Sequence, residues 1–324
     1  MNPKTVGMIT SYPGANQTDW LWQQTPESFG KWGNIIIRAN DPKPDFLLLY
    51  QFDFSRKSTP KKKLSLRERL RQLRQPKPLA PNLQEQFRGV PKERMIYLLR
   101  EPPLEEILEI NQHNYQQAQQ YCDYVSGPDR YAPVPDYMPA IWYHGNSFRE
   151  LNEMEPPSKV RPCSWITSGV NRSQNHQRRL NFLKQIVEQN LEVDLYGRNL
   201  PDWSNAQGSL NNKWYGMAPY SYNLSIENYA ENDLYVSEKL WDALLAWCLP
   251  IYYGGPAADK LLPPGSFLRL PSIDEKGIAF IKEVISTPDR WYEAKEAIAE
   301  ARQIILHKLN LMAWLDDYTS KFCS

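Results

Sequence analysis

The chain has 324 residues, which is longer than a single hydrophobic core usually grows, so its length predicts two domains. Its 38 lysines and arginines nearly balance its 37 acidic residues, giving a formal net charge of +1. Proteins that bind nucleic acid usually carry a marked basic excess, so this composition predicts no nucleic-acid partner.

Cysteines and apolar stretches also exclude several classes of protein. The four cysteines are far apart and form no CxxC pair, which argues against a disulfide scaffold and favours a reducing compartment. The first residues lack the pattern of a signal peptide, and the longest apolar stretch, residues 243–253, is too short to span a membrane. We therefore expect a cytoplasmic protein.

Short β-rich runs alternate with helical stretches along the chain. The first half contains VGMITSY, NIIIR, DFLLLY, RMIYLL and CDYVSG, and the second contains SWITSG, LEVDLYG, YNLSIEN, LPIYYGG and SFLRL. Helices are expected after His176, from Ser237, and as one long helix over residues 288–318. This alternation predicts an α/β fold, and the proline-rich segment at 155–162 divides it into two Rossmann-like halves, residues 1–157 and 158–324.

Residues 56–77 carry an unusual concentration of positive charge. They contain ten lysines and arginines against a single acid, Glu68, and predict an exposed basic helix. Two interpretations fit this run: a solvated surface segment, or a segment that contacts an anionic membrane surface and places the protein at the inner face of the membrane.

The most informative stretch is residues 220–255, which predicts a buried strand, a polar loop, a helix and a second strand. Ser237 suits the N-cap position because its hydroxyl can accept a hydrogen bond from a free N–H of the first turn. Lys239 adds a full positive charge to that helix start, which favours a bound diphosphate. The spacing alone fits equally well an exposed Glu238–Lys239 pair that only caps the helix.

The pattern EN-x6-YVSEKLWDAL followed by PIYYG resembles the signature of the α1,3/α1,4-fucosyltransferase family, bacterial type, in about a dozen ordered identities. Similarity continues upstream in SGVNRSQNHQRRLNFLKQI, EVDLYGR, CDYVSGPDRYAPVPDYMP and YLLREPP. The resemblance implies a GT-B-like fold, with an acceptor-binding domain (1–157) and a donor-binding domain (158–324) that face each other across a cleft. It also implies an inverting enzyme that moves L-fucose from GDP-fucose to a glycan hydroxyl, in α1,3 or α1,4 linkage.

The resemblance assigns roles to individual residues. Glu101, at the end of the run RMIYLL, is the implied catalytic base for the acceptor hydroxyl. The implied donor-binding residues are Arg179, Asn228, Tyr235, Glu238 and Lys239, and the further candidates for the donor side are Ser168, Arg178, Glu227 and Ser237. Arg178 is the alternative to Arg179 for the diphosphate, and the Ser168 loop departs from the family by reading Ser-Gly instead of Ser-Asn.

Several aspects of function stay open at this point. Because the sequence has no D-x-D and its four histidines are far apart, we expect no cofactor and no essential protein-bound metal, only GDP-fucose and an oligosaccharide or glycoconjugate acceptor. Four aromatic residues near the N-terminus either stack on acceptor sugars or pack in the core: Tyr12, Trp20, Trp22 and Trp32. The rival functions are an inverting transferase that uses another GDP-sugar, and a catalytically silent carbohydrate- or membrane-binding protein.

Overall fold

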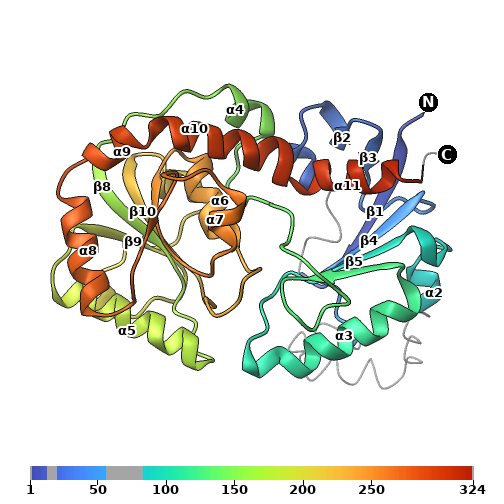
Figure 1. Ribbon diagram of the computed structural model, residues 1–324, viewed down its shortest axis with the longest axis horizontal. Helices are drawn as coiled ribbons and strands as arrows, with labels where there is room; N and C mark the ends of the chain where they lie inside the picture. Colours follow the sequence, from blue (N-terminus) through green and yellow to red (C-terminus); the bar gives the residue numbers. More distant parts are fainter. Residues whose placement is uncertain (1, 13–19, 56–82, 323–324) are drawn as a thin grey trace, which may run out of the picture.

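Two β-sheets, each with helices on both faces, organise the chain (Figure 1). The computed structural model describes residues 2–12, 20–55 and 83–322. The basic segment 56–77 lies outside these residues, so its predicted helix and its contact with a membrane stay predictions. No helix within the described ranges is both long and apolar enough to cross a membrane.

The first sheet has seven strands in the order β2-β3-β1-β4-β5-β6-β7. Their bounds are β1 (Lys4–Thr10), β2 (Lys31–Trp32), β3 (Ile35–Ile37), β4 (Phe46–Tyr50), β5 (Met95–Leu98), β6 (Tyr124–Gly127) and β7 (Val134–Pro135). All neighbours are parallel except β2 and β3. The central strands β4 and β5 are buried at every position, as continuous apolar runs predict for strands covered on both faces.

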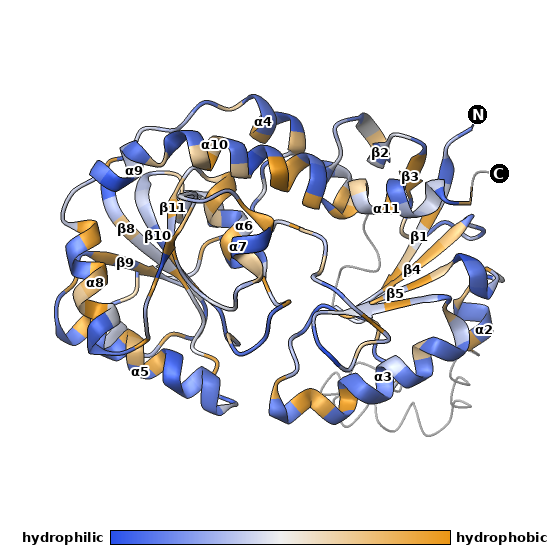
Figure 2. Ribbon diagram, in the orientation of Figure 1, coloured by the Kyte–Doolittle hydropathy of each residue, from blue (hydrophilic) through white to orange (hydrophobic). Residues whose placement is uncertain are grey.

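Helices from opposite ends of the chain cover this sheet. On one face, α3 (Leu108–Tyr121) buries Tyr115 and Ala118 against β4 and β5. The short α2 (Leu83–Gln86) precedes β5 in the sequence. On the other face, the last helix, α11 (Leu311–Ser320), buries Leu311, Met312 and Leu315. Figure 2 shows the apolar strands β1, β4 and β5 that these helices cover.

The second sheet has five parallel strands in the order β12-β11-β10-β8-β9. Their bounds are β8 (Arg161–Ile166), β9 (Val193–Tyr196), β10 (Tyr220–Ile226), β11 (Leu249–Tyr253) and β12 (Leu268–Arg269). The helices are α4 (Phe148–Glu153), α5 (Gln174–Glu188), α6 (Glu238–Leu245), α7 (Ala257–Leu261), α8 (Glu275–Ile285), α9 (Asp289–Glu293) and α10 (Lys295–Ile304). Apolar residues of α5, α6, α8 and α10 share one core with this sheet.

Every β-rich run predicted from the sequence forms a strand, but the prediction of one long helix over residues 288–318 is wrong. The chain there forms α9, α10, a π-helical turn (Ile305–Leu309) and α11. The break at Asn310 has a clear cause: its backbone is extended, it bridges to Ala140, and its side chain accepts a hydrogen bond from Met312 N that caps α11. Apolar spacing could not reveal this pairing with a distant segment.

The chain passes twice between the two domains, and the two passages lie side by side. Ala140 N donates to Leu309 O, and Leu311 N donates to Ala140 O. Phe148 of α4 is buried in the second core, although the sequence-based division at residue 157 assigned it to the first domain. Helix α11, assigned to the second domain, packs on the first sheet instead. The proline-rich segment at 155–162 is therefore not the domain boundary. The chain leaves one hydrophobic core and enters the other at the two paired crossings instead.

His144, in the first crossing segment, should make the protein sensitive to acid. The ring is 1% exposed, packs edge-on against Trp214, and its nitrogens have no hydrogen-bond partner within the described residues. Burial, opposed in part by the charge of Asp242, lowers the pKa of His144 from 6.5 to about 4. The unfolded chain therefore binds this proton first as the pH falls, so folding stability decreases from pH 6.5 towards pH 4, by roughly 3 kcal/mol at 1.36 kcal/mol per pKa unit.

Urea unfolding across this pH range tests the expectation. The unfolding free energy of His144→Gln should fall less steeply between pH 6.5 and 4 than that of the unmodified protein. His113→Gln, at an exposed position of α3, is the matched control and should follow the unmodified curve. Parallel curves for His144→Gln and the unmodified protein would contradict the role of His144.

Candidate active site

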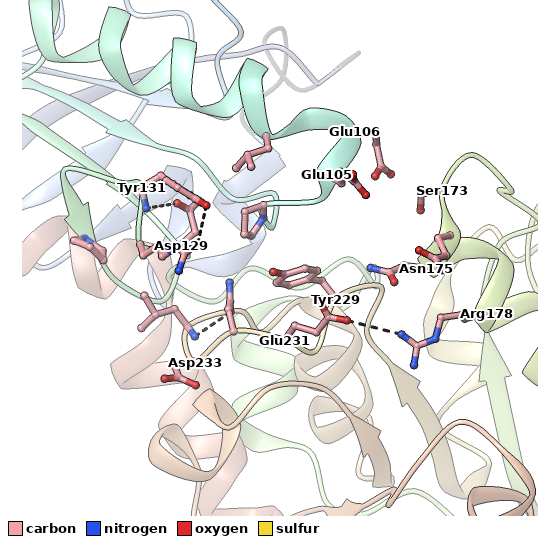
Figure 3. Close-up of a pocket in the computed structure, with 17 residues that line it drawn as sticks. Glu105, Glu106, Asp129, Tyr131, Ser173, Asn175, Arg178, Tyr229, Glu231 and Asp233 are labelled. Atoms are coloured by element: carbon pink, nitrogen blue, oxygen red, sulfur yellow. Dashed lines mark hydrogen bonds and ion pairs between the residues drawn. The ribbon is translucent and has the colours of Figure 1, made fainter.

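The carboxyl ends of the parallel strands in both domains point towards the space between them, which is where open α/β sheets bind their ligands. A cavity of about 1150 Å³ lies there, lined by both domains. Figure 3 shows Glu105, Glu106 and Asp129 on one side, and Asn175 and Arg178 on the other. A smaller cavity of about 20 Å³ shares Asn175, Arg178 and Glu231 with it and extends to Arg179, Glu227 and Asn228.

Glu101 follows the end of β5 and is held by the first domain. Its Oε1 accepts a hydrogen bond of 2.6 Å from the Tyr12 hydroxyl, and the side chain is half-buried. Gln51, at a left-handed φ of 50°, places its Oε1 to accept from the backbone N–H groups of Arg100 (2.7 Å) and Glu101 (3.2 Å). The loop that carries Glu101 is therefore fixed through both its backbone and its carboxylate.

Ser237 caps α6, as predicted, and joins a buried acid to Lys239. The Glu227 carboxylate accepts hydrogen bonds from Ser237 N (2.8 Å), Ser237 Oγ (2.7 Å) and Lys239 Nζ (3.1 Å). Burial would lower the pKa of Lys239, but the charges of Glu227 and Glu238 outweigh it and raise the pKa. Lys239 is thus a charged, partly exposed group at the helix start, not a fully solvated one.

Arg179 of α5 is buried in the second domain, whereas its neighbour Arg178 is half-exposed on the wall of the large cavity. The Arg179 side chain donates to Asn228 Oδ1 (2.5 Å) and to Ser168 O (2.7 Å), and the residue is 4% exposed. Among the described residues it has no carboxylate partner, its Nε is unbonded, and burial lowers its pKa to about 10. Arg178 has a half-exposed side chain 3.8 Å from Glu231. The geometry therefore favours Arg179 over Arg178 as the cation at the small cavity.

Tyr235 is a buried residue of the second domain, close to the start of α6. It is 6% exposed, and its backbone N–H donates to Asn232 Oδ1. Burial raises the pKa of its hydroxyl well above the usual value, and the negative charges of Glu227, Glu101 and Glu238 raise it further. The 2.6 Å bond from Arg100, the residue before Glu101, to Glu238 shows that the segment carrying the implied base lies close to the donor side.

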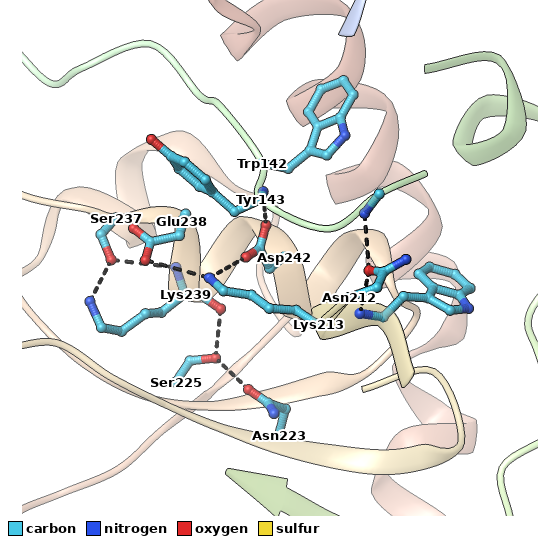
Figure 4. Close-up of polar contacts among 12 residues, drawn as sticks. Trp142, Tyr143, Asn212, Lys213, Asn223, Ser225, Ser237, Glu238, Lys239 and Asp242 are labelled. Atoms are coloured by element: carbon cyan, nitrogen blue, oxygen red, sulfur yellow. Dashed lines mark hydrogen bonds and ion pairs between the residues drawn. The ribbon is translucent and has the colours of Figure 1, made fainter. Parts of the chain in front are cut away.

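Four residues that the sequence did not single out lie around Glu238. One is Arg100 of the first domain, and the other three, Tyr143, Lys213 and Asp242, are seen in Figure 4. Arg100 Nη2 lies 2.6 Å from Glu238 Oε2, and Lys213 Nζ lies 3.6 Å from Glu238 Oε1. Buried Asp242 accepts from Lys213 Nζ (2.8 Å) and from Tyr143 N (2.8 Å). Burial would raise the pKa of Glu238, but Lys239, Lys213 and Arg100 hold it well below its usual range.

Two residues of the cluster around Glu238 could have been found from the sequence. Arg100 stands directly before Glu101, and Asp242 belongs to the run EKLWDAL, so both lie in the stretches that carry the resemblance. Lys213 had no such signal. The aromatic residues near the N-terminus mostly pack: Tyr12, Trp20, Trp22 and Trp32 lie against the first-sheet core, and Trp20 also stacks on Tyr143 at 5.8 Å.

Comparisons with known proteins match the second domain to one enzyme family. Residues 156–291 match the family model for the C-terminal part of glycosyltransferase family 10 (fucosyltransferase). The chain is 32% identical over 126 residues to alpha-(1,3)-fucosyltransferase 7 of Bos taurus, covering 38% of this chain and 33% of that protein. It is 30% identical over 135 residues to alpha-(1,3)-fucosyltransferase C of Drosophila melanogaster, covering 40% and 30%. The matches thus span about a third of the length of these relatives.

Among solved structures, an alpha-glucosyltransferase in complex with UDP-glucose and DNA containing an abasic site aligns over 98% of both chains, with a TM-score of 0.54 and 10% identity. This likeness concerns the fold, which is the GT-B arrangement of two Rossmann-like domains, as expected. Residues 156–291 of this chain are thus similar to the C-terminal part of glycosyltransferase family 10, the fucosyltransferase family, within a chain of GT-B fold.

Proposed function

We propose that this protein transfers L-fucose from GDP-fucose to a hydroxyl group of a glycan acceptor, with inversion at the anomeric carbon and in α1,3 or α1,4 linkage. One observation carries the proposal: the buried Arg179 guanidinium has no carboxylate partner among the described residues and lies in the domain that matches the family. A buried charge is costly unless an opposite charge pairs with it. The diphosphate of a GDP-sugar supplies that charge.

The neighbouring groups fit the chemistry of such a transfer. The acceptor oxygen forms a bond to C1 of fucose while the bond from C1 to the phosphate oxygen breaks, and the hydroxyl proton passes to Glu101. The leaving GDP gains negative charge, which Arg179 and Lys239 stabilise. Tyr12 donates to one carboxylate oxygen of Glu101 and leaves the other for the acceptor hydroxyl.

The acceptor fits the large cavity that both domains line. Its volume of about 1150 Å³ exceeds what a nucleotide-sugar alone needs, and Tyr131 and Tyr229 present rings to it. We place the enzyme in the cytoplasm, with the charge of residues 56–77 drawing it to the inner face of the membrane, as part of the same proposal.

Incubation with nucleotide-sugars and acceptors tests the function. The purified protein receives GDP-fucose, GDP-mannose or UDP-glucose with oligosaccharides ending in N-acetylglucosamine, glucose or galactose, and mass spectrometry detects products. We expect one added deoxyhexose, from GDP-fucose only. Transfer from GDP-mannose instead would favour the rival GDP-sugar enzyme. Binding of glycans without transfer or donor hydrolysis would favour the silent binding protein.

We also expect activity to survive chelation. Arg179 and Lys239 provide positive charge for the diphosphate, which is the contribution that a metal ion makes in metal-dependent transferases. Initial rates with GDP-fucose should be similar before and after exhaustive EDTA treatment and dialysis. A complete loss of activity that Mn²⁺ restores would count against the roles assigned to the two cations.

A further inference from the structure

Arg100 connects the two domains next to the implied base. It lies two residues beyond the end of β5, and its backbone N–H donates to Gln51 Oε1 together with that of Glu101. Its side chain, 14% exposed, donates 2.6 Å bonds to Tyr143 OH and to Glu238 Oε2, the second of these across the domains. Arg100 and Glu101 therefore move as one unit, and that unit is bonded to Glu238.

Glu238 is well placed to bind a donor and is already oriented without one. It is the first residue of α6, and its two carboxylate oxygens face Arg100 and Lys213. A carboxylate can accept about four hydrogen bonds, so both oxygens keep room for sugar hydroxyls. Arg100 donates from Nη2 to Oε2 while its Nη1 donates to Tyr143 OH, so the planar guanidinium is held at both ends and fixes the direction of the carboxylate. A lysine at 3.6 Å cannot do this.

Stability does not explain this ion pair. Removing two charges from water costs about as much as their attraction returns, so a buried pair contributes little net stability. Other contacts already hold the domains together: the two crossing segments pair at Ala140 and Asn310, and Asn232 Nδ2 donates to Pro128 O across the domains. What the pair does determine is the distance and direction between Glu238 and the loop that carries Glu101.

We propose that Arg100 is a positioning residue for the transfer, which holds the donor-side carboxylate of Glu238 in register with the base-carrying loop. This inference rests on the proposed function. Arg100 acts through Glu238 and Glu101 and leaves the diphosphate to Arg179 and Lys239. Its loss therefore affects the fucosyl group and its alignment with the acceptor, but not the nucleotide.

Arg100→Gln tests this separation, because a misplacement of about 1 Å can cost on the order of 10²-fold in rate. We expect kcat for transfer to fall about 10²-fold and donor KM to rise, while the Kd for GDP, measured by calorimetry, stays within about twofold. Transfer to the acceptor should fall more than hydrolysis of GDP-fucose. Arg100→Lys keeps the charge without the fork and should be intermediate. Tyr143→Phe, which removes only the hydroxyl bonded to Arg100, should have a smaller effect.

A double-mutant cycle with Glu238→Gln completes the test. If Arg100 acts through Glu238, Arg100→Gln has little further effect on kcat/KM in the Glu238→Gln background. Equal losses of GDP affinity, hydrolysis and transfer, together with a lower melting temperature, would show a structural role and overturn the inference. So would wild-type kcat in Arg100→Gln. Absence of transfer by the unmodified protein overturns the proposed function, and this inference with it.

Discussion

Replacing Glu101 with glutamine will lower kcat by roughly 10²- to 10⁴-fold, the usual contribution of a general base. Glutamine has the same size and its carbonyl still accepts the Tyr12 hydrogen bond, but it cannot take the proton of the acceptor hydroxyl. GDP binding should scarcely change, since the cations assigned to the diphosphate belong to the other domain. Steady-state rates at saturating acceptor and GDP calorimetry measure the two effects.

Glu109→Gln is the matched control for this prediction. Glu109 follows Glu101 in the same segment, is exposed on α3 and is not part of the lining of either cavity, so its substitution should leave kcat within about twofold of the unmodified protein. If Glu101→Gln keeps more than about a tenth of the unmodified kcat while chemistry limits the rate, another residue is the base.

Replacing Arg179 with glutamine will weaken GDP binding by about 1.5 to 3 kcal/mol, the range for hydrogen bonds to charged groups, which corresponds to roughly 10- to 150-fold in Kd. The effect is large because the guanidinium is buried and has no carboxylate of its own within the described ranges. Donor KM should rise and kcat should fall, because the same charge contacts the bound donor and the departing GDP. Calorimetry with GDP measures the first effect directly.

Arg178→Gln distinguishes this contact from general loss of positive charge. Arg178 precedes Arg179 on α5, but its side chain is half-exposed and faces Glu231, so its loss should change Kd less than threefold, or about 0.6 kcal/mol. Equal effects of the two substitutions would refute the assignment of Arg179. Lys239→Ala should resemble Arg179→Gln, whereas unchanged GDP affinity would leave Lys239 as a partner of Glu227 alone.

Local sequence patterns were sufficient where structure depends on neighbouring residues. Strands β4 and β5 are apolar at every position because both faces are covered, and an apolar run shows this directly. The cap of α6 by Ser237 follows from one hydroxyl near one helix start. The long helix failed for the opposite reason: Asn310 leaves helical geometry to pair with Ala140, 170 residues away in sequence.

The candidate active site also combines features that local sequence predicts with contacts that depend on distant residues. Sequence patterns were enough to predict the α/β class, the family resemblance over the second domain, and the residue types that a GDP-sugar and a base require. Which of the two arginines is buried could not be predicted from the sequence, since Arg178 and Arg179 are adjacent and chemically identical; the fold buries Arg179 and leaves Arg178 half-exposed. The pair of Arg100 with Glu238 depends on how the two domains pack, and the pair of Lys213 with Asp242 depends on how two separate segments of the second domain fold together. No local sequence pattern encodes either distance.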